Sequence, residues 1–458
     1  MYKLLIFLTI TFMIQAQSNN YKNLTLEDCI RLALERNKQK EISLQAIKKS
    51  EAQLKQAKSA KYPQLEFASF AFLNDENFTF VQPPLKIELP PINMGTFSLP
   101  FSSIEIPPQK FSVAENKSIL SDFSFVYPLY SGGKINSVIE QAKLGLSIAQ
   151  KDLELTESEI KYNVKKTFYS VLMAQKVNNI FNDALIRFET TYKLTETLYN
   201  AGSENVNKLD YLKIKMAYET FKGLNETISS NLITALSALK FLIGIEQNDE
   251  LTIVPEANQY DSSAVEKYLE SELLNESNIN MQKINNAIKV FEYKIREAKS
   301  DYYPSIALIG SYKRMDNSYK YGFSTKENQN IFSIGIGMKW SLFSGFRTDG
   351  KVEEIEAELF QLQNKKLYLN EGLNLQKEKL LNELKAAYIQ VESAKKAMET
   401  ASEYRELQLK AYMNDMGSVS DFIEAQLYES FLSAQYEYAQ FNRICKILEL
   451  EKIFGDIQ

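Results

Sequence analysis

The sequence predicts an α+β membrane protein in which one structural unit is used twice, and three observations support this prediction. Landmarks recur in the same order: segment 57–63 returns as segment 298–304, and segment 129–134 returns as segment 342–347. In each half an alternating pattern gives way to a helical one directly after Ser-Gly. Beyond the N-terminus, no apolar run approaches the roughly 20 residues that a membrane-spanning helix needs. Each half is therefore expected to hold a helix, two strands, a very long helix and a returning helix, and any membrane crossing must use the strands.

Residues 1–16 have the features of a cleavable secretory signal peptide. Lys3 precedes an apolar run from Leu4 to Ile14, and the small residue Ala16 ends the segment. The run is too short to span a bilayer as a helix, so we expect an exported protein. The predicted organisation after the signal is a first repeat over 17–244, a linker over 245–261 and a second repeat over 262–458.

The composition excludes several classes of function. Lysine and arginine total 53 against 58 acidic residues, so no basic surface points to nucleic acid. The 458 residues include no histidine, which excludes Ser-His-Asp and Cys-His catalysis and HExxH zinc sites. With no glycine-rich phosphate loop and no clustered ligands, we expect no enzyme, no cofactor and no metal site. The two cysteines, Cys29 and Cys445, are expected as buried free thiols, although an exported protein also permits a disulfide between them.

The first strand pair is predicted at about 64–82 and 117–130. A helix-like run from Thr25 must stop before Pro63, because the residue before a proline disfavours the helical conformation. Seven of the 11 prolines fall within 83–108. Because proline removes a backbone donor, we expect this segment to be a surface loop inserted at the hairpin tip, and the sequence does not indicate its role.

The second strand pair is predicted at about 305–316 and 331–343, directly after Pro304. In its last strand, large apolar residues alternate with small or polar ones such as Ser333, Gly335 and Gly337. The apolar residues are Phe332, Ile334, Ile336, Met338 and Trp340. A strand of a soluble sandwich also alternates, but strands of about 10 residues in an exported protein, with an aromatic residue at the boundary, favour the wall of an outer-membrane barrel. The five apolar residues are then predicted to face lipid.

The helices are predicted from the period that follows Gly132 and Gly345, the two strand-to-helix junctions. Apolar residues then keep a 4-3 spacing, which is typical of a coiled-coil seam. Two long helices are expected at about 134–200 and 347–414, each roughly 100 Å long at 1.5 Å per residue. Glycine-containing turns follow, and the returning helices are expected at about 206–243 and 420–455.

The number of strands predicts the oligomeric state. One chain supplies four strands, and a lipid-exposed sheet cannot keep free edges, because unpaired backbone groups are costly in hydrocarbon. Two chains would give 8 strands and three would give 12, and the small inner face around Gly335 and Gly337 suits an open lumen better than a packed one. We therefore expect a homotrimer with one shared pore, continued by a tube of long helices.

The chain resembles the TolC-like outer-membrane efflux proteins. The resemblance rests on segment 24–37, the Tyr-Pro junctions at Pro63 and Pro304, segment 128–133 and the Leu-Ile-Gly that ends at Gly244. It implies a 12-stranded β-barrel in the cell outer membrane above a 12-helix periplasmic α-barrel. Its partners would be two more copies of itself, outer-membrane lipid, a periplasmic adaptor (membrane-fusion) protein and an inner-membrane pump, with no nucleic acid. The function implied is the exit duct of a tripartite efflux or type I secretion system.

The resemblance also implies a periplasmic gate, formed by acids at the start of a returning helix. The matching positions are Asp421 and Glu424, one helical turn apart, while Asp210 occupies the equivalent start in the first half. The other interpretation is that these acids only complement the helix dipole. Two departures stand against a simple transfer: the second turn carries no arginine, and the Gly-to-Asp spacing of the two turns differs by four residues. The turn residues expected to contact the adaptor are Gly202, Ser203, Gly417 and Ser418.

A rival function is a periplasmic coiled-coil scaffold or adaptor without a pore. It would also have long helical hairpins and a signal, but it does not predict two strand pairs with wholly apolar faces. Within the exit-duct function, the sequence does not distinguish a drug, a metal ion, a peptide or a protein as the substrate, and it does not identify the pump or the adaptor.

Overall fold

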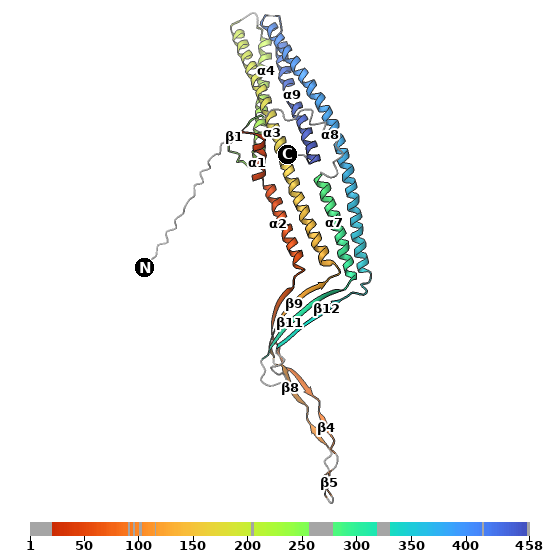
Figure 1. The fold of residues 1–458 in the computed structure, drawn as a ribbon. Helices are drawn as coiled ribbons and strands as arrows, with labels where there is room; N and C mark the ends of the chain where they lie inside the picture. The colour runs from red at the N-terminus through yellow and green to blue at the C-terminus, as the bar shows by residue number, and fades with distance from the viewer. Residues whose placement is uncertain are drawn as a thin grey trace, which may run out of the picture. The chain divides into compact units, whose positions relative to one another are not determined.

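The computed structural model describes residues 21–89, 92–94, 97–99, 103–114, 116–202, 206–255, 278–317, 330–414 and 416–455 (Figure 1). The predicted signal 1–16, the turn residue Ser203 and linker residues 256–261 lie outside these ranges. The chain divides into two compact units, a helical one and one that contains the strands, and each is described by itself. Within the described ranges, no helix combines the length and the hydrophobicity that a bilayer crossing requires.

The helical unit consists of residues 1–50, 145–288 and 361–458. The helices that lie in it wholly or in part are α1 (Leu26–Arg36), α2 (Lys38–Ser59), α3 (Lys134–Asn200), α4 (Lys208–Ile243), α7 (Ile279–Lys299), α8 (Arg347–Met413) and α9 (Val419–Phe454). Two short strands, β1 (Tyr21–Leu24) and β10 (Leu251–Ile253), pair in parallel beside them. The long helices form because no proline interrupts α3 or α8, so their hydrogen-bond ladders can run without a break.

Three apolar clusters hold the helical unit together. Cys29 and Leu239 lie in the cluster that joins α1, α3, α4 and β10, and Leu448 lies in the one that joins α7, α8 and α9. In the third, near the returning turns, the ring of Phe221 lies between those of Phe181 and Phe188, with centroids 5.1 and 4.9 Å away. Both cysteines are buried and no disulfide joins them, so the expectation of buried thiols is confirmed.

The second unit, residues 51–144 and 289–360, contains one four-stranded antiparallel sheet. Its strands are β2 (Gln64–Leu73), β9 (Lys117–Tyr130), β11 (Ser305–Asn317) and β12 (Asn330–Lys339), in the order β12-β11-β9-β2. The two hairpins of the repeat therefore lie side by side through β9 and β11. Within the described residues, β2 and β12 each have a neighbour on one side only, so the sheet has two open edges.

The structure corrects two of the predicted strands. The strand predicted over 64–82 is divided: β2 ends at Leu73, and β3 begins at Phe78 after a bend. The strand predicted to run to residue 343 ends at Lys339, because the chain turns there toward the helix that begins at Arg347.

The proline-rich segment was predicted to be a surface loop, and this is wrong. It forms a two-stranded antiparallel ribbon in which β3 (Phe78–Gln82) pairs with β8 (Gln109–Ala114), β4 (Leu85–Ile87) with β7 (Ile104–Ile106), and β5 (Ile92–Met94) with β6 (Phe97–Leu99). The four prolines of this segment that the structure describes fall between these strands and not inside them. Pro83 and Pro84 lie opposite Pro107 and Pro108, between the pairs Gln82–Gln109 and Leu85–Ile106, so no ladder donor is lost.

Candidate channel wall and helix-tip site

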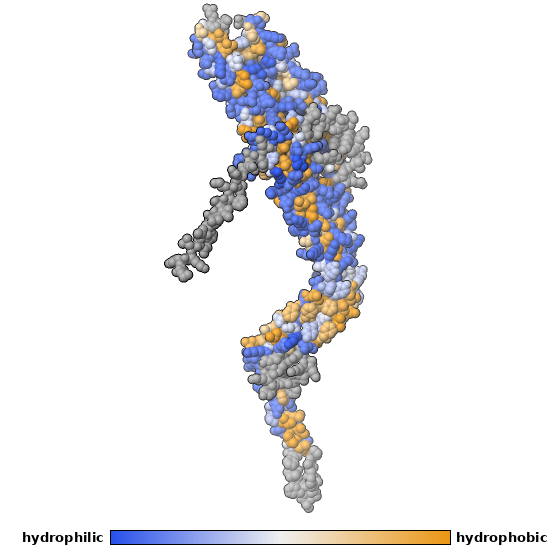
Figure 2. Space-filling view, turned by 60° about the vertical axis from the view of Figure 1, so that its left-hand side comes forward, coloured by the Kyte–Doolittle hydropathy of each residue, from blue (hydrophilic) through white to orange (hydrophobic). Residues whose placement is uncertain are grey.

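One face of the sheet is almost wholly apolar near the helices. Because paired residues share a face, the register aligns Phe332 with Tyr312, Phe123 and Phe67 in one row across all four strands. Phe332 and Ile336 leave 70% and 71% of their surface exposed, and Ile334 and Met338 are exposed to a similar degree. Figure 2 shows these hydrophobic residues gathered over the sheet. The predicted set, Trp340 included, thus lies on an exposed surface that water alone would not favour.

The opposite face of β12 is small or polar, and the face as a whole is mixed. Gly337 pairs with Ala307, and two rows on, Ser333 pairs with Ser311, whose hydroxyl lies 2.7 Å from that of Ser333. Between these rows, Gly335 pairs with Ile309, which is 43% exposed. Apolar residues on one face and small or polar ones on the other are the pattern of a wall between lipid and a wet lumen.

Aromatic side chains collect where the strands meet the helices. Nε1 of Trp340 donates a hydrogen bond to the backbone oxygen of Tyr302 at 3.0 Å. Tyr62, Tyr303 and Phe343 are exposed at the same boundary. Amphipathic rings at one edge of an apolar band are typical of a membrane interface.

The two junction glycines adopt left-handed conformations, with φ +61° at Gly132 and +63° at Gly345. Their surroundings differ: a Cβ on Gly132 would lie 2.8 Å from the oxygen of Ser300, whereas nothing lies within 4 Å of one on Gly345. Pro63 and Pro304, the predicted helix-to-strand junctions, immediately precede β2 and β11.

At the returning turns, Asp210 and Asp421 occupy equivalent positions, each three residues after the N-cap of its helix. The side chain of Asn207 accepts a hydrogen bond from the backbone N–H of Asp210 at 3.0 Å, and Ser418 does the same for Asp421 at 3.1 Å. Both aspartates therefore lie in the first turn of their helices, where an acid also stabilises the helix dipole. Gly202 has a left-handed φ of +73°, as a helix C-terminus favours, and Gly417 lies just before the Ser418 cap.

Comparison with known proteins identifies the family. The model of the outer membrane efflux protein family matches residues 29–244 and 271–443. The chain belongs to the outer membrane efflux protein family. It is an outer-membrane exit channel of an efflux system, as the sequence predicted, and not a scaffold without a pore.

Solved structures share the fold of this channel. The outer membrane protein VceC of Vibrio cholerae matches with a TM-score of 0.72 at 14% identity, over 94% of this chain and 96% of that one. The CmeC outer membrane channel of Campylobacter jejuni gives 0.72 at 15% identity, over 94% and 85%. The MtrE outer membrane channel of Neisseria gonorrhoeae gives 0.71 at 15% identity, over 94% and 89%. No curated protein sequence matches the chain.

The efflux protein has a charged contact at the tips that the sequence analysis did not find. Nζ of Lys213, on α4, lies 2.7 Å from the hydroxyl of Ser420, on α9. Lys213 and Glu424 line one groove between these two helices. The side chain of Glu424 in turn accepts a hydrogen bond from Tyr428, which raises the pKa of that phenol. A signal was present in the sequence: Lys213 and Glu424 are equivalent positions of the two repeats, 211 residues apart like Asp210 and Asp421, but their charges are opposite.

Farther along the helices, one carboxylate of the channel joins three of them. The two oxygens of Glu429 on α9 lie 2.9 Å from Nη2 of Arg187 on α3 and 2.9 Å from Nε of Arg405 on α8. Glu429 is 15% exposed and Arg405 is 17% exposed, so the pairs are only weakly screened by water. This contact fixes the lateral packing of the two long helices against α9.

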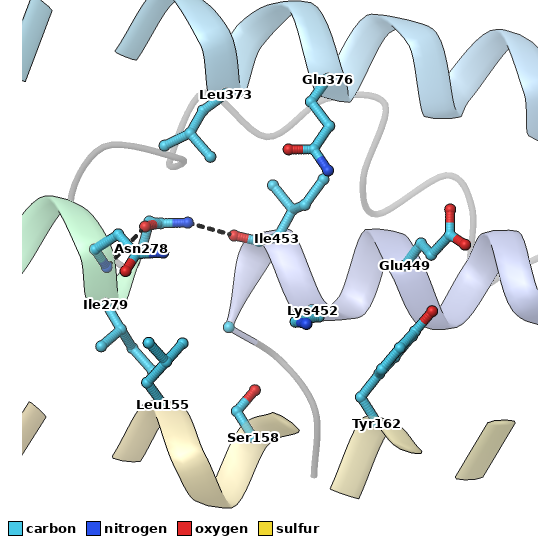
Figure 3. Close-up of a pocket in the computed structure, with 12 residues that line it drawn as sticks. Leu155, Ser158, Tyr162, Asn278, Ile279, Leu373, Gln376, Glu449, Lys452 and Ile453 are labelled. Atoms are coloured by element: carbon cyan, nitrogen blue, oxygen red, sulfur yellow. Dashed lines mark hydrogen bonds between the residues drawn. The ribbon is translucent and has the colours of Figure 1, made fainter. Parts of the chain in front are cut away.

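A pocket at the start of α7 has a structural role (Figure 3). Nδ2 of Asn278 donates to the backbone oxygen of Ile453 at 3.0 Å, while its Oδ1 accepts from the N–H of Asn280 at 2.9 Å. One side chain thus caps both the start of α7 and the end of α9. The first repeat has the same arrangement, since Asn37 donates to the oxygen of Leu242 at 3.4 Å and accepts from Gln39. The pocket therefore lies where the start of α7 meets the end of α9.

Proposed function

We propose that this efflux channel works as a homotrimer whose three sheets close into one 12-stranded barrel in the outer membrane. The observation that carries the proposal is the four-stranded sheet, with an exposed apolar face and open edges at β2 and β12. In hydrocarbon, each unpaired backbone group would cost several kcal/mol, and closure between copies satisfies them all. Twelve strands leave a lumen, which agrees with the small side chains on the other face.

In this proposal the helices of the three copies form a periplasmic tunnel of 12 helices. A periplasmic adaptor protein joins its tips, at the turns around Gly202 and Gly417, to an inner-membrane pump. Adjacent grooves and exposed turns support this placement of the adaptor. The pump selects the substrate and the channel supplies the exit.

A purified, detergent-solubilised sample tests the assembly. Mass photometry is expected to give three times the mass of the mature chain, and planar bilayers are expected to show discrete conducting steps. A protein that leaves the membrane without detergent and remains monomeric would refute the proposal.

We further propose that the tips gate the tunnel through Asp421 and Glu424, with Asp210 contributing in the first repeat. Three copies bring six carboxylates of α9 to one ring, which favours cations at the mouth. Lys213 ties α4 to the start of α9 in each copy and opposes part of that charge. The same aspartates also lie in the first turn of their helices, where they stabilise the helix dipole, so the two interpretations of these acids are compatible.

The double variant Asp421→Ala with Glu424→Ala tests whether these acids gate the tunnel or only stabilise the helix dipole. It is expected to raise single-channel conductance or lower the preference for cations in planar bilayers. Glu219→Ala, which removes an exposed acid farther along α4, is the matched control and is expected to change neither. Unchanged conductance and selectivity in the double variant would leave only the interaction with the helix dipole.

A further inference from the structure

Toward the end of the sheet that lies away from the helices, the apolar face gains polar and charged residues, and the opposite face gains aromatic ones. On the exposed apolar face, the row of Phe332 is followed by a polar row. This polar row consists of Ser69, Ser121, Arg314 and Asn330. The hydroxyls of Ser69 and Ser121 lie 3.0 Å apart, and Nε of Arg314 lies 2.8 Å from a carboxylate oxygen of Asp316. In the next rows the charged residues Asp316 and Lys117 pair with the exposed Ile119 and Leu73, so the wholly apolar band ends at this level.

The opposite face, which exposes Ile309 and Val126 nearer the helices, carries larger apolar side chains at this level. After a mixed row in which Asp122 pairs with Lys313, Phe70 pairs with Leu120 and Leu120 pairs with Met315. Phe70 is 54% exposed and Met315 is 41% exposed. The ring of Phe72, the next residue on this face, lies 6.2 Å from that of Phe70. Exposing aromatic residues to water is unfavourable, and exposed apolar patches mark interaction sites. We therefore expect another apolar group to cover these residues.

The ribbon that extends from this end of the sheet supplies a second uncovered apolar face. It continues β2 and β9 directly, since the N–H of Asn74 donates to the oxygen of Asn116 at 2.8 Å and that of Asn116 donates to Oδ1 of Asn77 at 2.7 Å. Figure 1 shows the ribbon beyond the sheet, where β8 and β4 are labelled.

Between β4 and β7 the ribbon has one apolar and one charged face. Leu85 pairs with Ile106 and Ile87 pairs with Ile104, while Lys86 and Glu105 pair on the other face. Ile104 is 52% exposed. An isolated two-stranded ribbon is only marginally stable in water, so its apolar face also needs a partner.

The geometry of the proposed trimer makes copies of the same chain the natural partner. Twelve strands about 4.8 Å apart and tilted by about 40° enclose a ring roughly 24 Å across, which places the three ribbon roots about 20 Å from one another. Residues 78–89 span roughly 40 Å at about 3.3 Å per residue. The ribbons are therefore long enough to meet above the pore, while the face with Phe70 and Met315 is the one that turns toward the lumen.

We propose that the three copies close the outer mouth of their own pore with an apolar seal. The ribbons pack together through the face of Leu85, Ile87 and Ile104, above a ring formed by Phe70, Phe72 and Met315 of each copy. An apolar constriction of this kind blocks water and ions by dewetting and yields to a substrate that is pushed from below. This inference rests on the proposed trimer.

Cysteine crosslinking tests the contact between ribbons. Ile104→Cys on the apolar face is compared with Glu105→Cys on the charged face, using a short bis-maleimide on intact cells. Ile104→Cys is expected to give chain-to-chain dimers, and Glu105→Cys only monomers. Equal crosslinking of the two, or a crosslink from Ile104→Cys to another protein and not to a second copy, overturns the seal. Mass photometry of each variant reports the trimer separately, so loss of assembly is distinguishable from loss of the ribbon contact.

Conductance tests the closure itself. The ribbon can be removed by joining Gln82 to Gln109 through Asn-Gly, because these residues are directly paired and Asn-Gly favours a two-residue hairpin turn. This variant, and separately Phe70→Ser with Met315→Ser, is expected to raise single-channel conductance about two-fold or more. Ile119→Ser, at the same level on the other face, is the matched control and is expected to leave conductance unchanged. Wild-type conductance in both test variants, with the trimer intact, overturns the proposal.

Discussion

Replacing Gly132 with alanine is expected to destabilise the junction between the sheet and α3, whereas the same change at Gly345 is expected to do much less. Both glycines have left-handed backbones, which cost a residue with a Cβ about 1–2 kcal/mol. At Gly132 the new Cβ would also lie 2.8 Å from the oxygen of Ser300 and 2.9 Å from Cβ of Tyr303. Relieving such overpacking typically costs a further 1–3 kcal/mol, roughly. The expected loss is therefore about 2–5 kcal/mol at Gly132 and about 1–2 kcal/mol at Gly345.

The chain contains one tryptophan, and it reports on this region. Trp340 is hydrogen-bonded to the backbone of Tyr302, next to the residues that Gly132 contacts. Its fluorescence during guanidinium unfolding of the detergent-solubilised channel gives a transition midpoint for each variant. The midpoint of Gly132→Ala is expected to fall well below that of Gly345→Ala, which in turn falls slightly below that of the wild type.

Equal midpoints for the two alanine variants would refute this reasoning. The backbone strain is common to both positions, so only the contact with Ser300 and Tyr303 separates them. A result in which Gly345→Ala is the weaker variant would mean that the open surroundings of Gly345 in one chain are filled in the assembled channel.

Three further outcomes are expected. Burial raises the pKa of the Cys445 thiol to about 11, so at pH 8 only about one thiol in a thousand is ionised. Maleimide is therefore expected to label neither Cys445 nor Cys29 until the protein is denatured. Rapid labelling of the folded channel would contradict the burial of these thiols. Glu429→Gln leaves two arginines without their counter-charge and is expected to lower stability by about 2–4 kcal/mol, against less than about 0.5 for the exposed Glu392→Gln, as thermal unfolding can measure. Asn278→Ala removes a cap from two helices at once and is expected to cost about 2–3 kcal/mol in the same measurement, with no change in conductance.

The strand pattern at the end of the second hairpin was readable from sequence because a single physical rule governs it. Each side chain of β12 from Phe332 to Met338 meets either the exposed face or the small one, and strand geometry alternates the two. The long helices were readable for a similar reason, since only a local breaker could have ended them and none is present in α3 or α8.

The ribbon was not predicted because the number of prolines in segment 83–108 does not exclude strands. What decides is where each proline lies relative to the hydrogen-bonded pairs. Prolines exclude a ladder only where the ladder needs their N–H, and Pro83, Pro84, Pro107 and Pro108 face one another in the gaps between strand pairs. That alignment depends on the register of two segments more than 20 residues apart, which no local pattern specifies.

The contact of Lys213 with Ser420 was missed for a different reason. The two residues are 207 positions apart, and they meet only because α4 packs beside α9. The second turn contains no arginine of its own. Its basic partner is Lys213, which belongs to the other repeat. Comparing the repeats position by position would have found it.

The opposite charges of Lys213 and Glu424 make the two repeats of one chain inequivalent at this position, although the repeats share a fold. At Asp210 and Asp421 the halves are interchangeable, so a partner that touches only those residues would meet six equivalent places around the proposed trimer. One turn farther along, lysine alternates with glutamate, and the equivalent places number three. A docking protein that contacts Lys213 or Glu424 therefore distinguishes the two helical hairpins of each copy. It can bind at one hairpin of each copy and not at the other.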